Sequence, residues 1–299
     1  MRILLLGAHG QVGRELSKTL APLGELILAT RDGGGATIAA DLGDAVSLSV
    51  ALDAANADVI VNAAAYTAVD RAEDEPDRAR RINADALAEI GHWARAKRAR
   101  VVHFSTDYVF DGKSERPYRE DDATSPLGVY GRTKLAGEHA LRDSGCDHFI
   151  FRTAWVYASH GKNFLLTMLK LGAERDELRI VDDQRGTPTS AKLIAEVTAS
   201  VLAHDAKPTD GIYHLCAGGE CTWFEFARSI FERAHVAKLI DRVPRIVAIT
   251  TADFPTTAER PRYSVLDTAK LRGAFGVDLP AWQHGLDAVI GELASGATR

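Results

Sequence analysis

The sequence predicts an α/β protein with a doubly wound parallel sheet and a smaller C-terminal α/β domain that binds substrate. Two observations carry this prediction. Short apolar runs alternate with longer helical patterns through the first half of the chain, and a glycine-rich turn joins the first run to the first helix. Strand–helix–strand repetition places helices on both faces of a parallel sheet, so we expect a Rossmann-like architecture.

Five apolar runs predict the strands of the main sheet: Ile3–Leu6, Leu26–Ala29, Val59–Val61, Val101–Phe104 and Phe149–Phe151. The helices predicted between them are Val12–Leu20, Val46–Ala54, Asp77–Ala96 and Pro126–Leu141. Ser125 is the expected N-cap of the last helix, with Pro126 at its first position. His103 lies inside an apolar strand, and we interpret it as a hydrogen-bonded core histidine.

After Phe151 the alternation loosens. A run at Gly211–Leu215 is expected to return to the main sheet, so residues 1–152 with a strand near 211–216 form the predicted dinucleotide-binding domain, and 153–299 mainly form the substrate domain. The segments Arg185–Thr189 and Thr256–Ser264 resemble loops that cover a ligand. The remaining patterns predict a strand at Leu178–Val181 and helices at Gly161–Leu171, Ala191–Leu202, Thr222–Ala234, Thr268–Ala274 and Trp282–Leu293.

Composition excludes several classes of protein. The 299 residues are 46% hydrophobic and 26% charged, as in a globular protein, and the net charge of −5 argues against a nucleic-acid partner. No apolar run is long enough to span a bilayer. The three cysteines, Cys146, Cys216 and Cys221, fit neither a zinc site nor a disulfide framework. We therefore expect a cytoplasmic protein with free thiols and no metal site.

The glycine-rich turn, Gly7-Ala8-His9-Gly10-Gln11-Val12-Gly13, predicts a dinucleotide site. Gly7 permits the tight turn, Gly10 lets the backbone approach a pyrophosphate, and Gly13 lets the helix pack close to the sheet. The helix N-terminus offers N–H groups to phosphate. The residues expected to bind the cofactor here are Gly7, His9, Gly10, Gln11 and Val12.

The end of the second strand leaves the choice of cofactor open. If Thr30 occupies the position that discriminates NAD from NADP, Arg31 follows it and can bind a 2′-phosphate. If Asp32 reaches back to the ribose, NADH is favoured. Arg31 is nearer to the end of the apolar run, so NADPH is the preferred cofactor. Asp41 and Leu42 are expected at the adenine, with a helix N-cap as the competing role for Asp41.

Asn62-Ala63-Ala64-Ala65-Tyr66 follows the strand at Val59–Val61. Small side chains let a flat cofactor lie against the backbone, so we expect Ala63 to Tyr66 to contact it. Simple close packing is the alternative explanation for the alanines.

The chemical centre is predicted at Tyr130-Gly131-Arg132-Thr133-Lys134. Tyr130 and Lys134 are one helical turn apart and point the same way. A phenol has an ordinary pKa near 10, and a neighbouring cation makes it a better acid. Such a pair suits proton transfer to a carbonyl oxygen. Thr106, in Ser105-Thr106-Asp107 at a strand end, is the expected third member.

In this order, these motifs resemble those of extended short-chain dehydrogenases/reductases, and more narrowly those of the dTDP-4-dehydrorhamnose reductase family. The segments that carry the narrower resemblance span most of the chain: 62–70, 105–112, 130–138, 152–157, 183–188 and Arg260-Pro261.

The resemblance implies reduction of the 4-keto group of dTDP-4-dehydrorhamnose by NADPH. Tyr130 would donate the proton, Lys134 would hold the nicotinamide ribose and bias Tyr130 towards ionisation, and Thr106 would hydrogen-bond the carbonyl oxygen. The same resemblance places Thr106, Asp107, Trp155 and Arg185 at the substrate, with Trp155 beside the sugar and Arg185 at the diphosphate.

Other functions remain open at this level. Related dehydratases carry an Asp-Glu pair after the threonine, whereas here Tyr108 follows Asp107, so dehydration is disfavoured. An epimerase needs mainly the same Tyr, Lys and cofactor. The regulatory β subunit of methionine adenosyltransferase also resembles these reductases without being one. The expected partner is a nucleotide sugar, and the expected state is a monomer or homodimer.

Overall fold

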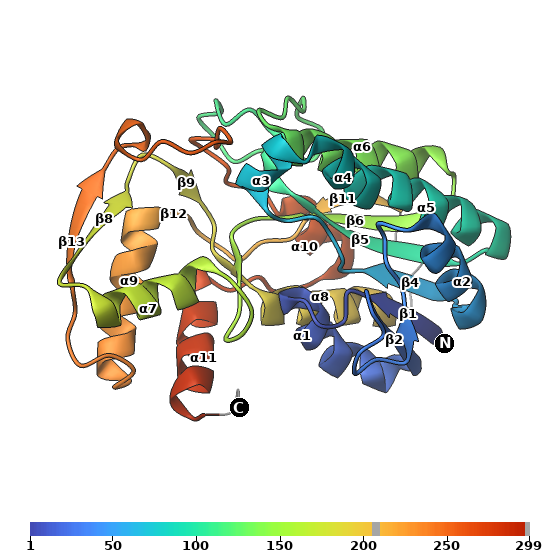
Figure 1. The fold of residues 1–299 in the computed structure, drawn as a ribbon, viewed down its shortest axis with the longest axis horizontal. Helices are drawn as coiled ribbons and strands as arrows, with labels where there is room; N and C mark the ends of the chain where they lie inside the picture. Colours follow the sequence, from blue (N-terminus) through green and yellow to red (C-terminus); the bar gives the residue numbers. More distant parts are fainter. Residues whose placement is uncertain (205–209, 297–299) are drawn as a thin grey trace.

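The computed structural model describes residues 1–204 and 210–296. Its centre is a seven-stranded parallel sheet with the strand order β11-β6-β5-β4-β1-β2-β3 (Figure 1). These strands are β1 (Arg2–Leu6), β2 (Glu25–Thr30), β3 (Ile38–Ala39), β4 (Val59–Asn62), β5 (Arg100–Thr106), β6 (Asp147–Thr153) and β11 (Gly211–His214).

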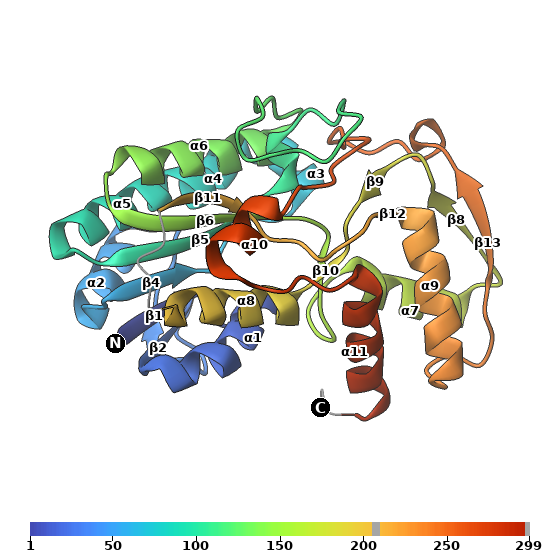
Figure 2. The same ribbon diagram turned by 180° about the vertical axis from the view of Figure 1, so that it is seen from behind.

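Both faces of the sheet are covered, which is why its strands are nearly continuous apolar runs. Alternate residues of one strand enter different cores: Leu4 and Leu6 face one side, and Ile3 and Leu5 face the other. The first face packs against α2 (Ala45–Ala55), α5 (Ala86–Lys97) and α6 (Val129–Asp143). The second packs against α1 (Gln11–Leu20), α8 (Ala191–Ala203) and α10 (Ala269–Phe275), as Figure 2 shows.

The strand order reverses beside β1, which lies between β2 and β4. In doubly wound sheets ligands bind at the carboxyl ends of the strands next to such a reversal. Gly7 follows β1 there, Asn62 ends β4, and Thr106 ends β5. The topology therefore brings the predicted cofactor and catalytic segments to one edge of the sheet.

A second lobe, on the left in Figure 1, has its own core around Phe226, Phe231 and Trp282. It contains α7 (Phe164–Glu174), α9 (Trp223–Val236), α11 (Trp282–Ala294), and the parallel strands β8 (Glu177–Val181) and β13 (Arg245–Ile249). Two-residue strands connect the lobes: β7 (Val156–Tyr157) pairs with β10 (Thr189–Ser190), and β9 (Arg185–Gly186) pairs with β12 (Cys221–Thr222).

The predicted fold class is confirmed, including the smaller C-terminal α/β part. The run at Gly211–Leu215 does pair with β6 as a strand of the main sheet. The predicted range 153–299 includes residues 205–209 and 297–299, which lie outside the described residues.

Three predicted helices differ from the structure, and the one predicted at Gly161–Leu171 begins at Phe164 and ends at Glu174 as α7. Helix α6 begins at Val129 with Gly128 as N-cap, so the prediction of Ser125 and Pro126 as its first residues was wrong. Ser125 instead donates its backbone N–H to the Val109 carbonyl in a loop. The predicted helix over Asp77–Ala96 is interrupted by a π-helical turn, η2 (Arg81–Asp85), between α4 (Pro76–Arg80) and α5. The short helix α3 (Val69–Asp74) precedes it.

Helix α6 is held against the sheet by a buried ion pair. The side chains of Glu138 and Arg152 are 0% and 3% exposed, and Arg152 Nη2 lies 2.7 Å from Glu138 Oε2. Arg152 Nε donates to Glu138 Oε1 at 3.0 Å, and Ser105 Oγ donates to the same oxygen at 2.5 Å. These contacts connect α6 to β6 and to β5 one residue before Thr106.

Glu138→Gln is expected to destabilise the fold by about 3 kcal/mol, because it leaves the Arg152 guanidinium buried without its counter-charge. Equilibrium urea unfolding measures the loss. Glu177→Gln is the matched control, because its ion pair with Arg245 is exposed and such pairs contribute little. Equal, small effects of the two substitutions would contradict this account of how α6 is anchored.

Candidate active site

The predicted catalytic residues meet where β5 ends against the start of α6. Thr106 is the last residue of β5, Asp107 begins the short helix η3 (Asp107–Val109), and Tyr130 and Lys134 occupy successive turns of α6. Gly131 makes this approach possible, because a Cβ there would lie 2.3 Å from the Tyr108 carbonyl oxygen. The rings of Tyr108 and Tyr130 then pack edge to face, with centroids 5.6 Å apart.

The phenol of Tyr130 is a weak acid in this structure. Burial raises the pKa of Tyr130 to about 12; a hydrogen bond with the Thr106 side chain lowers it, and the charge of Asp107 raises it further. Lys134 does not contribute to this shift. The priming of Tyr130 by Lys134 that the sequence suggests stays a prediction.

Lys134 itself is buried and bound elsewhere. Its Nζ donates to the Phe104 carbonyl at 2.6 Å and lies 3.0 Å from His103 Nε2. Burial lowers the pKa of Lys134 to about 7, and the nearby Glu138 charge only partly opposes this shift. Lys134 is thus poised to lose its charge near neutral pH.

Thr106 and Asp107 form a hydrogen-bonded pair. The Thr106 hydroxyl donates to Asp107 Oδ1 at 3.0 Å and accepts from the Tyr108 backbone N–H at 3.2 Å. Burial raises the pKa of Asp107 to about 6, an effect that the hydroxyls of Ser264 and Thr106 reduce. The carboxyl group next to Thr106 therefore changes charge close to neutral pH.

The glycine turn forms the cradle expected for a dinucleotide. Gly7 has a positive φ of 78°, and its carbonyl accepts from the Gly10 N–H at 2.9 Å. Helix α1 begins directly after Gly10 and has no side-chain N-cap, so its first N–H groups are available to a phosphate. A Cβ on Gly13 would lie 2.1 Å from the Gly7 carbonyl oxygen, which explains why glycine is needed there.

The loop after β4 lies against this cradle. A Cβ on Gly7 would lie 2.7 Å from the Ala64 nitrogen and 2.9 Å from the Ala63 carbonyl carbon, so Ala63 and Ala64 are in close contact with the turn. The loop is held by Asn83, whose amide accepts from the Tyr66 N–H and donates to the Tyr66 carbonyl. The sequence interpretation missed Asn83, although a polar residue within an apolar helical pattern was a usable signal.

The end of β2 fits NADPH better than NADH. Asp32 Oδ1 accepts from the Gly34 N–H at 3.1 Å, so this carboxylate stabilises its own turn. Thr30 is buried, whereas Arg31 is exposed and makes no hydrogen bond or ion pair with any residue that the structure describes. An exposed guanidinium at this edge suits a 2′-phosphate.

Three further predicted cofactor residues have defined surroundings. Asp41 Oδ1 accepts from the Gly43 N–H, and the N-cap of α2 is Asp44, so Asp41 does not have the competing capping role. Leu42 is buried in the core beneath α2, so most of the surface of its side chain already packs against that core. His9 is exposed in the glycine turn.

Trp155 and Arg185 lie at the junction of the two lobes. Trp155 has a positive φ of 46° and stacks on Trp223 with ring centroids 3.5 Å apart. Arg185 Nη1 lies 3.3 Å from Glu220 Oε1. The Arg185 backbone N–H donates to the Arg262 carbonyl, and this hydrogen bond connects β9 to the loop at 256–264. The structure thus places the two predicted substrate residues together with the two predicted loops.

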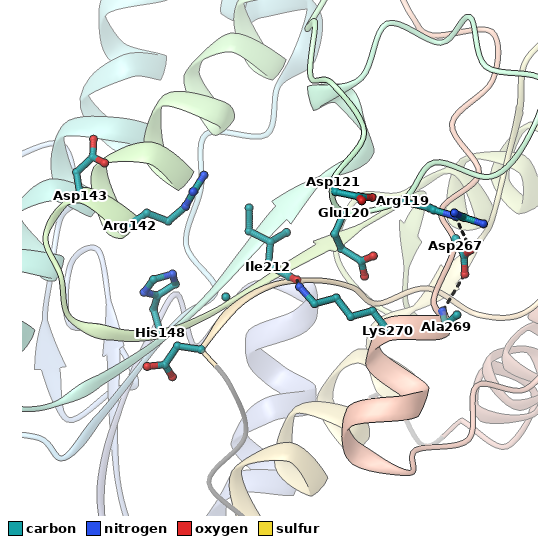
Figure 3. A pocket seen from close by; sticks show the side chains of 12 residues that line it. Arg119, Glu120, Asp121, Arg142, Asp143, His148, Ile212, Asp267, Ala269 and Lys270 are labelled. Atoms are coloured by element: carbon teal, nitrogen blue, oxygen red, sulfur yellow. Dashed lines mark hydrogen bonds and ion pairs between the residues drawn. The ribbon is translucent and has the colours of Figure 1, made fainter.

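Two cavities are large enough for a ligand. One of about 650 Å³ lies in the second lobe, where Phe164, Trp223, Arg179 and Arg260 contribute to its wall. The other, of about 970 Å³, opens at the edge strand β11 (Figure 3). Charged side chains of both signs line this second cavity, and Lys270 donates to the Ile212 carbonyl within it. None of the predicted site residues lines it.

Comparisons with known proteins identify the family of this chain. The family model described as RmlD substrate binding domain matches residues 1–295. The dTDP-4-dehydrorhamnose reductase of Escherichia coli K12 is 45% identical over 295 residues, which cover 98% of each chain. A crystal structure of a dTDP-4-dehydrorhamnose reductase from Clostridium acetobutylicum superposes with a TM-score of 0.89 at 36% identity, over 98% of this chain and 99% of that one.

A second solved structure, dTDP-4-dehydrorhamnose reductase from Bacillus anthracis in complex with NADP, has a TM-score of 0.88 at 32% identity, covering 97% of this chain and 99% of that chain. The fold and the Thr–Tyr–Lys arrangement define the class of extended short-chain dehydrogenases/reductases. Within that class, the chain belongs to the dTDP-4-dehydrorhamnose reductase family.

No group of three or more His, Cys, Asp or Glu side chains in 1–204 and 210–296 is arranged to hold a metal ion. No helix in the same ranges is both long enough and apolar enough to cross a bilayer.

Gly13→Ala is expected to abolish NADPH binding, because the added methyl group would displace the Gly7 carbonyl and open the cradle. Fluorescence titration of the coenzyme measures the affinity. Gly291→Ala is the control: it lies inside α11 with open space around its Cβ, so alanine there preserves binding and slightly stabilises the helix. Unchanged coenzyme affinity in Gly13→Ala would refute the assigned cradle.

Proposed function

We propose that this protein reduces the 4-keto group of dTDP-4-dehydro-6-deoxy-L-mannose (dTDP-4-dehydrorhamnose) with NADPH and releases dTDP-L-rhamnose. Full-length relatives carry the name of this reductase, and one solved relative contains NADP. The observation that carries the proposal is that Thr106, at the end of β5, meets Tyr130 of α6, one turn before Lys134, at the edge of the sheet where the glycine turn follows β1.

The reduction adds a hydride to the carbonyl carbon and a proton to its oxygen. Bound NADPH supplies the hydride. Tyr130 donates its phenolic proton to the oxygen as negative charge develops there, and solvent later restores that proton. The Thr106 hydroxyl turns from Asp107 to donate to the same oxygen, so two donors stabilise the developing charge.

Cofactor binding is assigned to the residues at the strand ends. The first N–H groups of α1, at Gln11 and Val12, bind the pyrophosphate, and Arg31 binds the 2′-phosphate. The loop from Ala63 to Tyr66 lies along the cofactor, and Lys134 holds the nicotinamide ribose.

The second lobe is assigned to the nucleotide sugar. The cavity of about 650 Å³ has aromatic walls for the base, and Arg179 and Arg260 supply positive charge for a diphosphate. Trp155 stands at the junction beside the sugar, and Arg185 would exchange its Glu220 partner for phosphate oxygens. We further expect a cytoplasmic monomer or homodimer with no nucleic-acid partner.

A spectrophotometric assay of NADPH oxidation tests the reaction. NADPH absorbance should fall only when the keto sugar is added, and NMR of the product should show a secondary alcohol at C4. Product formation without net NADPH consumption would identify an epimerase. Binding of both ligands without turnover would instead support a regulatory subunit.

Tyr130→Phe is expected to lower kcat by about 10²-fold or more, because it removes the proton donor but preserves the ring packing. Steady-state kinetics measure the effect. Tyr157→Phe is the matched control, since the buried Tyr157 hydroxyl has no hydrogen-bond partner among the described residues. Wild-type turnover by Tyr130→Phe would show that another group gives the proton.

A further inference from the structure

A buried polar chain crosses from the sheet into the catalytic helix. Asn62 on β4 is paired in register with His103 on β5, and the His103 ring lies between Asn62 and Lys134 of α6. The exposed fractions of the three residues are 1%, 0% and 1%. Water therefore cannot substitute for their mutual hydrogen bonds, so donors and acceptors must match along the chain.

The orientation of the Asn62 amide is fixed at one end. Its Oδ1 accepts the Ala64 backbone N–H at 3.1 Å, so the amide NH₂ group is the part that faces the imidazole. Asn62 Nδ2 lies 3.3 Å from His103 Nδ1. A primary amide nitrogen only donates, and His103 Nδ1 must therefore accept.

The tautomer of His103 follows from this contact. A neutral imidazole that accepts at Nδ1 carries its proton on Nε2. Burial holds the pKa of His103 well below its ordinary value, so the ring stays neutral. Nε2–H then points at Lys134 Nζ, 3.0 Å away.

An ammonium group at that position would bring two hydrogen-bond donors face to face, its own N–H and His103 Nε2–H. A neutral amine has a lone pair that accepts from His103 Nε2–H, and it can still donate to the Phe104 carbonyl. We propose that Asn62 and His103 are positioning residues that hold Lys134 as a neutral amine in the cofactor-free enzyme.

The surroundings of Lys134 are compatible with this state. On α6 the nearest charged group is Glu138, which favours the ammonium form. Arg152 of β6 is paired with Glu138 and balances its charge, while β4 contributes only the neutral Asn62 amide and β5 the neutral His103 ring. Burial remains the largest influence and lowers the pKa of Lys134 to about 7.

A kinetic consequence follows, and it rests on the proposed function. Lys134 is an ammonium below its pKa and an amine above it, and Tyr130 is a better acid beside the ammonium. The value of kcat/KM for NADPH reports ionisations of the free enzyme. It should therefore decline as the pH rises through the pKa of Lys134, near neutrality in the wild-type protein.

The direct test needs no activity. In cofactor-free protein labelled with ¹⁵N-histidine, two-bond ¹H–¹⁵N spectra identify the tautomer of each ring, and His103 is the signal lost in His103→Gln. We expect the Nε2–H tautomer in the wild type and Nδ1–H in Asn62→Asp, because a carboxylate accepts from Nδ1. An Nδ1–H or doubly protonated His103 in the wild type would overturn the proposal.

The kinetic test uses His103→Gln, which adds no charge and can turn its amide oxygen toward Lys134. An oxygen acceptor favours the ammonium, so the alkaline midpoint of kcat/KM for NADPH should rise by about one pH unit. Ile60→Val, a mild change in the same strand as Asn62, should leave the midpoint in place. NADPH affinity, followed by fluorescence over the same pH range, should shift in parallel.

The outcomes separate this inference from the proposed function. A midpoint that stays near the wild-type value in His103→Gln, with stability alone reduced, would mean that His103 only fills space, and the inference fails. If no variant turns over the keto sugar, the proposed reaction fails, while the tautomer of His103 and the pH dependence of NADPH affinity still decide the state of Lys134.

Discussion

The burial of two charge-bearing side chains on one face of α6 is the constraint on which the site depends. Lys134 and Glu138 are one turn apart, and both are enclosed between the helix and the sheet. Each needs polar partners that only β5 and β6 supply: His103 and the Phe104 carbonyl for Lys134, and Arg152 for Glu138. The helix therefore has one favourable position and rotation.

That position decides where Tyr130 lies, because it is one turn before Lys134 on the same face. Close contacts between the α6 backbone and neighbouring backbone carbonyls also fix the position of Tyr130. Gly131 meets the Tyr108 carbonyl, and a Cβ on Gly137 would lie 2.0 Å from the carbonyl oxygen of Asn83. Asn83 in turn donates to the Thr133 hydroxyl and holds the loop at Tyr66, so the catalytic helix and the cofactor loop share one support.

The sequence predicted the features that depend on local pattern. Every strand of the main sheet except the two-residue β3 was identified, because a strand buried on both faces has an unbroken apolar run. The start of α6 was misplaced because Ser125-Pro126 is a good capping sequence that here serves a loop. The protonation of Lys134 was not predictable, because it depends on hydrogen bonds among β4, β5 and α6. Those contacts exist only in the folded chain.

The weak acidity of Tyr130 and the lowered pKa of Lys134 have a common cause in burial, and they are compatible with a reductase. A proton donor must keep its proton until the carbonyl oxygen gains charge. A phenol with a pKa of about 12 is protonated at neutral pH. Burial therefore keeps the proton on Tyr130 until a carbonyl oxygen beside it gains negative charge.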